Sequence, residues 1–88
     1  MLERAEVARR IEGFLRDRFA IDAGDAHFNA DVHLFDYGYV DSFGAVELTT
    51  FLESAFQIVI SSADLVHYPM NTVNELADFV VRRKRGEC

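Results

Sequence analysis

The sequence has few residues of the kinds that build disulfide frameworks, metal centres or membrane spans. It contains one cysteine, Cys88, so no internal disulfide can form. No apolar run approaches the ~20 residues that a membrane helix needs, and the charged start does not resemble a signal peptide. The three histidines, His27, His33 and His67, lack metal-ligand spacing. We therefore expect a cytoplasmic protein with no membrane span and no metal, and we interpret Cys88 as a tolerated terminal residue.

Positive charge is missing from the middle of the chain, although the net charge is only −6. Between Phe19 and Val81 there is no lysine or arginine. Such a stretch repels phosphate backbones, which argues against nucleic acid as a partner, and it attracts basic protein surfaces. An ordinary solubilising surface has the same composition, so charge alone does not identify the partner. The ten acids of this stretch are Asp22, Asp25, Asp31, Asp36, Asp41, Glu47, Glu53, Asp64, Glu75 and Asp78.

The length of 88 residues fits one compact domain, which we assign to residues 1–88. Half of the residues are apolar, which is enough for one core. A domain of this size buries only about 60% of its unfolded surface, and it has no room for a deep cleft between domains. The length therefore argues against a self-sufficient enzyme.

Apolar periodicity predicts helices over about 2–19, 41–56, 61–66 and 72–84, with Pro69 following the third. Three main helices, one short helix and one long loop predict an all-α four-helix bundle. The expected buried faces consist of Val7, Ile11, Phe14, Leu15 and Phe19, then Ala45, Leu48, Leu52, Ala55 and Phe56, and finally Val73, Leu76, Ala77, Val80 and Val81.

Two helix starts carry capping signals. Asp41 is suited to accept hydrogen bonds from the first amides of the second main helix. Thr72 and Glu75 have the spacing of a capping box, in which each side chain satisfies one free amide. The basic cluster 82–85 follows the last helix, where cations favour the helix dipole, and we interpret it as a solvated helix end.

The segment 21–40 has no helical periodicity. We therefore predict an ordered loop that is held in place by Phe28, Leu34 and Phe35. Tyr37 and Tyr39 continue an alternating aromatic series that begins at Phe35. This series either shapes a surface beside the following helix or pins the loop. Residues 57–60 are rich in β-branched side chains, but they have no evident pairing partner, so we expect an extended connection.

The stretch from Leu34 to Leu48 resembles the carrier-protein family. The signature of that family is a glycine, one or two residues, then Asp-Ser and a large apolar residue at a helix start. Here it reads Gly38, Tyr39-Val40, Asp41-Ser42 and Phe43. The resemblance extends from about Val7 to Val81. The spacing of two residues between the glycine and the aspartate is similar to that in D-alanyl carrier proteins and other dedicated carriers.

By this resemblance, Ser42 accepts 4′-phosphopantetheine from coenzyme A, and a transferase supplies the base and a metal ion. A small, exposed hydroxyl at a helix start suits this role, because the aligned amides favour the negative charge of a phosphodiester. The alternative is that Ser42 only helps Asp41 to cap the helix. The resemblance also implies that Phe43, Val46 and Glu47 face partner enzymes. The alternatives are core packing for the two apolar residues and a solvated charge for Glu47.

The resemblance implies a monomeric carrier that performs no catalysis. It would hold an acyl or aminoacyl group as a thioester and present it to other proteins. The implied partners are a phosphopantetheinyl transferase, a loading ligase and downstream transferase or synthase enzymes. Asp36, Asp41 and Glu47 are the acids nearest the site, and we expect them to attract a basic docking surface. The alternative function is that of a carrier-like interaction domain that is never modified.

Overall fold

The computed structural model describes residues 2–87, and this range contains four helices and no strand. The all-α prediction is confirmed, and each helix end lies within two residues of its predicted position. Three predicted helices, which were expected to start at residues 41, 61 and 72, begin one residue later, because the capping residue itself is outside the helix. The helices are α1 (Arg4–Arg18), α2 (Ser42–Phe56), α3 (Ser62–His67) and α4 (Val73–Lys84).

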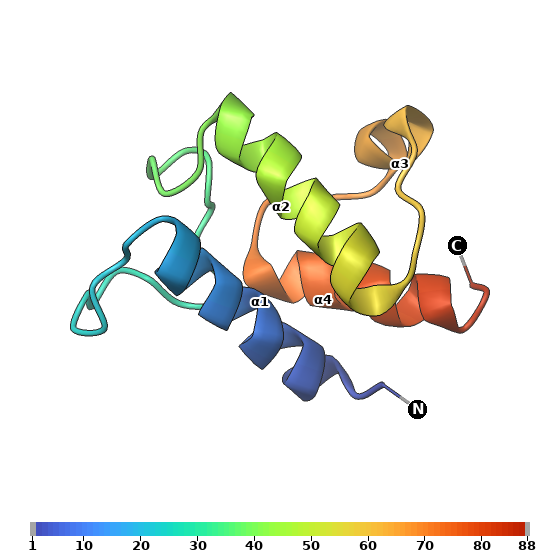
Figure 1. Ribbon diagram of the computed structural model, residues 1–88, viewed down its shortest axis with the longest axis horizontal. Helices are drawn as coiled ribbons and strands as arrows, with labels where there is room; N and C mark the ends of the chain where they lie inside the picture. Colours follow the sequence, from blue (N-terminus) through green and yellow to red (C-terminus); the bar gives the residue numbers. More distant parts are fainter. Residues whose placement is uncertain (1, 88) are drawn as a thin grey trace.

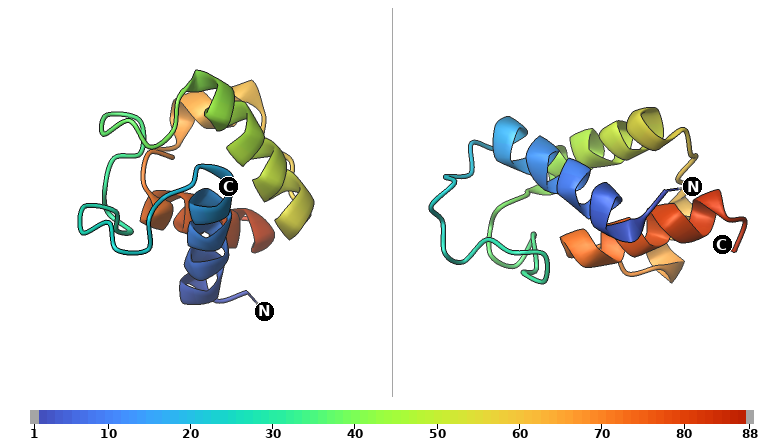
Figure 2. Two further views of the ribbon diagram at one scale, coloured as in Figure 1. Left: turned by 60° about the vertical axis from the view of Figure 1, so that its left-hand side comes forward. Right: turned by 90° about the horizontal axis from the view of Figure 1, so that it is seen from below.

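The three longer helices form the body of the molecule, and α3 lies away from α1, beside α2 and α4 (Figures 1 and 2). The neighbouring helices α1 and α2 run in opposite directions, and α4 packs against α1. The loop between α1 and α2 covers one end of the bundle. The start of α1 and the end of α4 lie at the other end (Figure 1).

The core confirms most of the predicted apolar faces. Val7, Ile11 and Leu15 of α1 are fully buried. Phe14, Phe19, Ala45 and Ala55 were predicted to be buried, but they are only half-buried and pack against the edge of the core. Phe14 instead stacks on Phe51 of α2, with 4.2 Å between ring centroids. The other core side chains on helices are Leu48, Leu52, Phe56, Val73, Leu76, Ala77, Phe79, Val80 and Val81.

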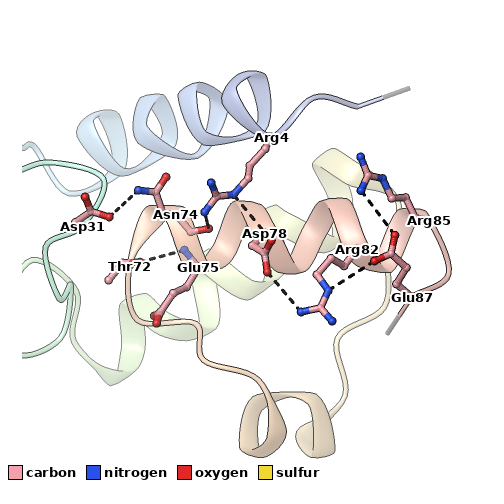
Figure 3. Close-up of polar contacts among 9 residues, drawn as sticks. All are labelled: Arg4, Asp31, Thr72, Asn74, Glu75, Asp78, Arg82, Arg85 and Glu87. Atoms are coloured by element: carbon pink, nitrogen blue, oxygen red, sulfur yellow. Dashed lines mark hydrogen bonds and ion pairs between the residues drawn. The ribbon is translucent and has the colours of Figure 1, made fainter.

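The cap of α4 differs in part from the prediction. The hydroxyl of Thr72 accepts a hydrogen bond from the amide of Glu75 at 3.0 Å, as predicted (Figure 3). The carboxylate of Glu75, however, accepts from the amide of Asn71 at 2.8 Å, one residue before the expected donor. The complete capping box lies at α3 instead. There Ser61 and Asp64 each accept from the other's amide, an arrangement that was not predicted.

The loop 21–40 is tied to the start of α4. The amide of Leu34 donates to the carbonyl of Asn71 at 2.8 Å, and the amide of Asn74 donates to the carbonyl of Ala30 at 3.0 Å. The side chain of Asn74 also donates to Asp31 at 2.7 Å (Figure 3). The predicted anchors are found in or beside the core, where Phe28 and Leu34 are buried and Phe35 is half-buried; Val32 and Val40 are buried as well.

Of the two roles considered for the aromatic series, Tyr39 has the second, which is to hold the loop in place. Its ring contacts Phe28, with 5.2 Å between centroids, and its hydroxyl donates to Asp25 at 2.9 Å. Desolvation, followed by the hydrogen bond to Asp25, raises the pKa of Tyr39. The amide of His27 and the hydroxyl of Tyr39 lower the pKa of Asp25. Tyr39 therefore pins the loop, whereas the side chain of Tyr37 is exposed.

The basic cluster 82–85 is not uniformly solvated. Arg82 pairs with Asp78 at 3.6 Å and Arg85 with Glu87 at 3.7 Å, all on exposed surface (Figure 3). Arg83 differs, because its side chain is 23% exposed and its guanidinium binds a carboxylate of α3. The prediction of a solvated helix end was therefore wrong for Arg83, and the sequence could not show it because the partner lies on another helix.

Residues 57–60 follow α2 as an extended connection, as predicted. The change of direction occurs at Gln57, whose φ of 55° is in the left-handed region. Over the described range, no helix has both the length and the apolar character that crossing a membrane requires. Cys88 lies outside the described residues.

Candidate functional site

Ser42 is the first residue of α2, and its side chain lies on the surface. The first hydrogen bond of the helix runs from the amide of Ala45 to the carbonyl of Asp41 at 2.8 Å. The amides of Ser42 and Phe43 precede this bond, so they have no acceptor within the helix. Their partial positive charge is available to an anionic group beside the hydroxyl of Ser42.

Asp41 caps this helix start, as predicted. Its carboxylate accepts a hydrogen bond from the amide of Gly44 at 2.7 Å. The cap satisfies the third amide of the helix and fixes the backbone on which Ser42 stands.

Gly44 allows α2 to begin directly on the ring of Phe19, the residue that follows α1. A β-carbon at position 44 would lie 2.6 Å from Cε1 and 2.9 Å from Cζ of that ring. Any side chain at this position would therefore force the ring or the helix to move. Our sequence reasoning missed this role. The contact joins residues 25 positions apart, so local spacing gave no signal for it.

The turn before Ser42 explains the two residues between Gly38 and Asp41. Gly38 has a φ of 78°, a conformation that favours glycine. The amide of Val40 then donates to the carbonyl of Leu34 at 3.1 Å, and its side chain is 2% exposed. Tyr39 thus anchors the turn to the loop, and Val40 anchors it to the core. The two residues between Gly38 and Asp41 therefore hold the start of α2 in place from different sides.

The side chains of Phe43 and Val46 are exposed, at 73% and 66%. This exposure rules out the alternative of core packing for both residues. Large apolar side chains on a surface lower the free energy of a complex when a ligand or another protein removes them from water. Both residues lie in the first part of α2, near Ser42.

Glu47 was predicted to face partner enzymes, and the alternative considered for it, a solvated charge, does not hold. Arg18 of α1 binds it through two hydrogen bonds of 2.6 Å, and the Glu47 side chain is 29% exposed. Glu53, the other acid of α2, accepts from the amide of Ile60 at 2.8 Å. Both carboxylates of this helix therefore have partners within the molecule. Asp36 remains exposed at 76% of its side chain, 3.7 Å from Nδ1 of His33.

A groove of about 380 Å³ lies along α2 on the side of α3. Its apolar walls include Val46 of α2, Leu65 of α3, and Phe35 and Met70 of the connecting segments. The groove was not predicted, because its walls come from five separate parts of the chain, including Leu76 of α4. It can accept a flexible, partly apolar chain that starts near the beginning of α2.

The described residues 2–87 hold no group of three histidine, cysteine or acidic side chains that could bind a metal ion. The site offers instead an exposed hydroxyl, free amides at a helix start, exposed apolar side chains and an adjoining groove. These features are typical of a small helical protein that presents a side chain to other proteins.

Comparison with known proteins identifies the family. Residues 6–80 match the family described as "Phosphopantetheine attachment site". The D-alanyl carrier protein of Streptococcus uberis is 39% identical over 66 residues, which cover 68% of this chain and 84% of the relative. That of Streptococcus suis is 33% identical over 76 residues, covering 86% and 92%. The chain therefore belongs to the phosphopantetheine-attachment family.

Membership of this family confirms three predictions. The chain is a carrier protein and not an enzyme, and its prosthetic group is a covalently attached 4′-phosphopantetheine. As a carrier it interacts with a phosphopantetheinyl transferase and with a ligase that loads it.

Proposed function

We propose that Ser42 carries the phosphopantetheine arm and that the arm holds an acyl or aminoacyl group as a thioester for partner enzymes. One observation carries the assignment. Ser42 is an exposed serine at the first position of α2, behind the Asp41 cap. Attachment replaces the hydroxyl proton of Ser42 with the phosphopantetheine group and releases the nucleotide part of coenzyme A.

The residues around Ser42 fit this group. The amides of Ser42 and Phe43 would hold the phosphate, because they are free of helical acceptors and carry partial positive charge. Val46, Phe35 and Leu65 would contact the arm along the groove of about 380 Å³. The base and the metal ion for attachment would come from the transferase, so Ser42 needs no catalytic neighbour in this chain.

An aminoacyl cargo has the best support. The relatives from Streptococcus uberis and Streptococcus suis are D-alanyl carrier proteins by name, and the spacing between Gly38 and Asp41 is similar to theirs. We therefore propose D-alanine as the first cargo to test. Thioester formation by a D-alanine-activating ligase with ATP, measured by intact mass, would support it. Loading by short acyl groups alone would favour the acyl alternative.

The attachment site can be tested with a matched control. Ser62 is also an exposed serine at the first position of a helix, α3, and it follows a cap residue as Ser42 does. With coenzyme A and a broad-range transferase, the wild type and Ser62→Ala should each gain one phosphopantetheine by intact mass. Ser42→Ala should gain none while keeping its helical circular dichroism. Modification of Ser42→Ala, or an unmodified wild type, would contradict the assignment.

We infer that partners dock mainly through the apolar side chains Phe43 and Val46. The acids first expected to steer a basic partner are largely engaged, since Arg18 holds Glu47 and the backbone of α2 holds Asp41. Asp36 is the remaining candidate for long-range attraction. A cytoplasmic location and a monomeric state belong to the same proposal, and equilibrium sedimentation tests the second.

The two docking modes differ in their salt dependence. Val46→Asp should slow loading at all ionic strengths, because it removes an apolar contact. Asp36→Asn should slow loading only at low salt, because screening shortens the reach of an exposed charge. Ala5→Asp serves as a control, since Ala5 is an exposed position of α1 that does not line the groove. Equal loading rates for Val46→Asp and the wild type would contradict apolar docking.

A further inference from the structure

The short helix α3 buries almost no apolar surface. Every residue of α3 is described, and Asp64 is its only buried residue, at 8% exposure. Leu65 and Val66 are 53% and 81% exposed. Isolated helices shorter than about 12 residues are marginal in water. Polar contacts must therefore hold these six residues in place.

Those contacts converge on one carboxylate. Asp64 accepts from the amide of Ser61 at 2.8 Å, which closes the capping box of α3. It also accepts from both terminal nitrogens of Arg83, at 2.7 Å and 3.2 Å. The guanidinium of Arg83 reaches across from α4 and donates to the carbonyl of Val59 at 3.0 Å as well. Arg83 thus grips α3 and the connection that leads into it.

Arg83 is itself held in position. Its guanidinium carbon lies 4.9 Å from the centre of the Phe79 ring, which belongs to the buried face of α4. The side chains of Arg83 and Asp64 are only 23% and 12% exposed, so solvent screens the pair less than a surface pair. The Arg83 guanidinium lowers the pKa of Asp64 to about 2, so this carboxylate is ionised at neutral pH.

The position of α3 matters because Leu65, next to Asp64, forms one wall of the groove beside α2. Val46 and Leu48 of α2 lie among the other walls. We propose that Arg83 is a positioning residue, whose ion pair with Asp64 fixes α3 at the distance from α2 that gives the groove its size. The use of the groove by the phosphopantetheine arm rests on the proposed function, whereas the positioning of α3 does not.

Hydrogen exchange of the full-length, unmodified chain tests the proposal. Arg83→Gln should speed exchange in α3 roughly tenfold, while α1 and the first turns of α4 keep the wild-type rate. Arg83→Lys should be intermediate, because it keeps the charge and loses the two-point geometry. Arg82→Gln is the matched control, since its pairs lie within α4 and with Glu87. Equal α3 exchange in Arg83→Gln and Arg82→Gln would overturn the proposal.

A second variant guards against a general loss of stability. Asp64→Asn removes the same ion pair from the other side, and its amide oxygen can still accept from Ser61. It should speed α3 exchange alone and shift the methyl resonances of Leu65 and Val46. Faster exchange spread evenly over α1 and α4 in both variants would overturn the proposal. Transferase modification of the wild type is measured separately, so an error about Ser42 cannot be mistaken for an error about Arg83.

Discussion

The two sides of this molecule use apolar residues in opposite ways. On the side of α1 and α4, Val7, Ile11, Val73 and Val80 are fully buried, and Asp78 forms exposed ion pairs with Arg4 and Arg82. On the side of α2 and α3, large apolar side chains face solvent and charged groups are held by internal partners. The exposed residues on this second side are Phe43, Val46, Val59, Leu65 and Val66.

The side of α1 and α4 therefore stabilises the fold, whereas the side of α2 and α3 presents apolar side chains on the surface. The free energy of unfolding of a small domain is only about 5–15 kcal/mol. Apolar residues that remain on the surface are not removed from water, so they add little to it. Two of them, Phe43 and Val46, lie beside Ser42 at the start of α2, where another protein can cover them. We therefore expect substitutions on the first side, and on the inner face of α2, to change the free energy of unfolding. Substitutions on the outer face of α2 should change recognition instead.

The sharpest test of this division lies within α2 itself. Leu52→Ala should lower the free energy of unfolding by about 2–5 kcal/mol, because Leu52 is 1% exposed and its loss leaves a cavity. Val46→Ala, on the outer face, should change it by less than about 0.5 kcal/mol. Urea denaturation of both variants gives the comparison. Similar losses would mean that the two faces of α2 are not energetically distinct.

A pair of glycine substitutions sharpens the comparison between the start of α2 and the exposed face of α1. Gly44→Ala should destabilise the protein by about 1–2 kcal/mol, because the added carbon would lie 2.6 Å from the Phe19 ring. Gly13→Ala should stabilise it by up to about 1 kcal/mol, because position 13 is in α1 with open space around it. Thermal melts measure both.

The cause assigned to the Gly44 effect has its own control. Phe19→Leu shortens the side chain that the new methyl group would meet. Combined with Gly44→Ala, it should recover part of the loss, so the two effects should not add. A strictly additive double variant would show that the close contact with Phe19 is not the reason.

A smaller effect is expected at the start of α4. Thr72→Ala removes the acceptor of the Glu75 amide and should cost about 1 kcal/mol. Thr72→Ser keeps the acceptor and should stay close to the wild type. Urea melts of the two variants separate the cap from other effects of the side chain. A Thr72→Ser variant as unstable as Thr72→Ala would contradict the capping role.

The last prediction concerns acid stability. The pKa of Asp64 is lowered from 3.8 to about 2, first by its hydrogen bond from Arg83. A lowered pKa in the folded state stabilises the fold fully above the unfolded value, and this stabilisation is lost as pH falls from about 4 to 2. Asp64→Asn should therefore flatten the acid limb of a plot of melting temperature against pH. An unchanged limb would contradict the ionic contact.

The sequence predicted the elements better than their mutual contacts. Helical periodicity, Asp41 and Thr72 located the four helices, because these signals act within a few residues. The complete capping box at Ser61 was missed, since its acidic member is an aspartate rather than the usual glutamate or glutamine. A local motif was enough to propose Ser42 as the site, whereas the groove beside it was not predicted, because its walls come together only on folding.

Charged residues were the least predictable part. Glu47 lies off the apolar stripe of α2, and its binding by Arg18, 29 residues earlier, was not predicted. Arg83 belongs to a basic cluster that resembles a solvated helix end, yet it binds Asp64, 19 residues earlier. Composition and periodicity place a charge on a face of a helix. They do not say which other helix will bring a counter-charge to it.

The distribution of positive charge also bears on the chemical lifetime of the cargo. Every cation of the chain except one is an arginine, and the one lysine, Lys84, ends α4. That helix end lies across the molecule from the start of α2 (Figure 1). Thioesters are cleaved by amines but hardly by guanidinium groups. On the proposed assignment, a thioester carried near Ser42 meets no side-chain amine at the start of α2, so aminolysis by the protein's own lysine should not limit the lifetime of the loaded form.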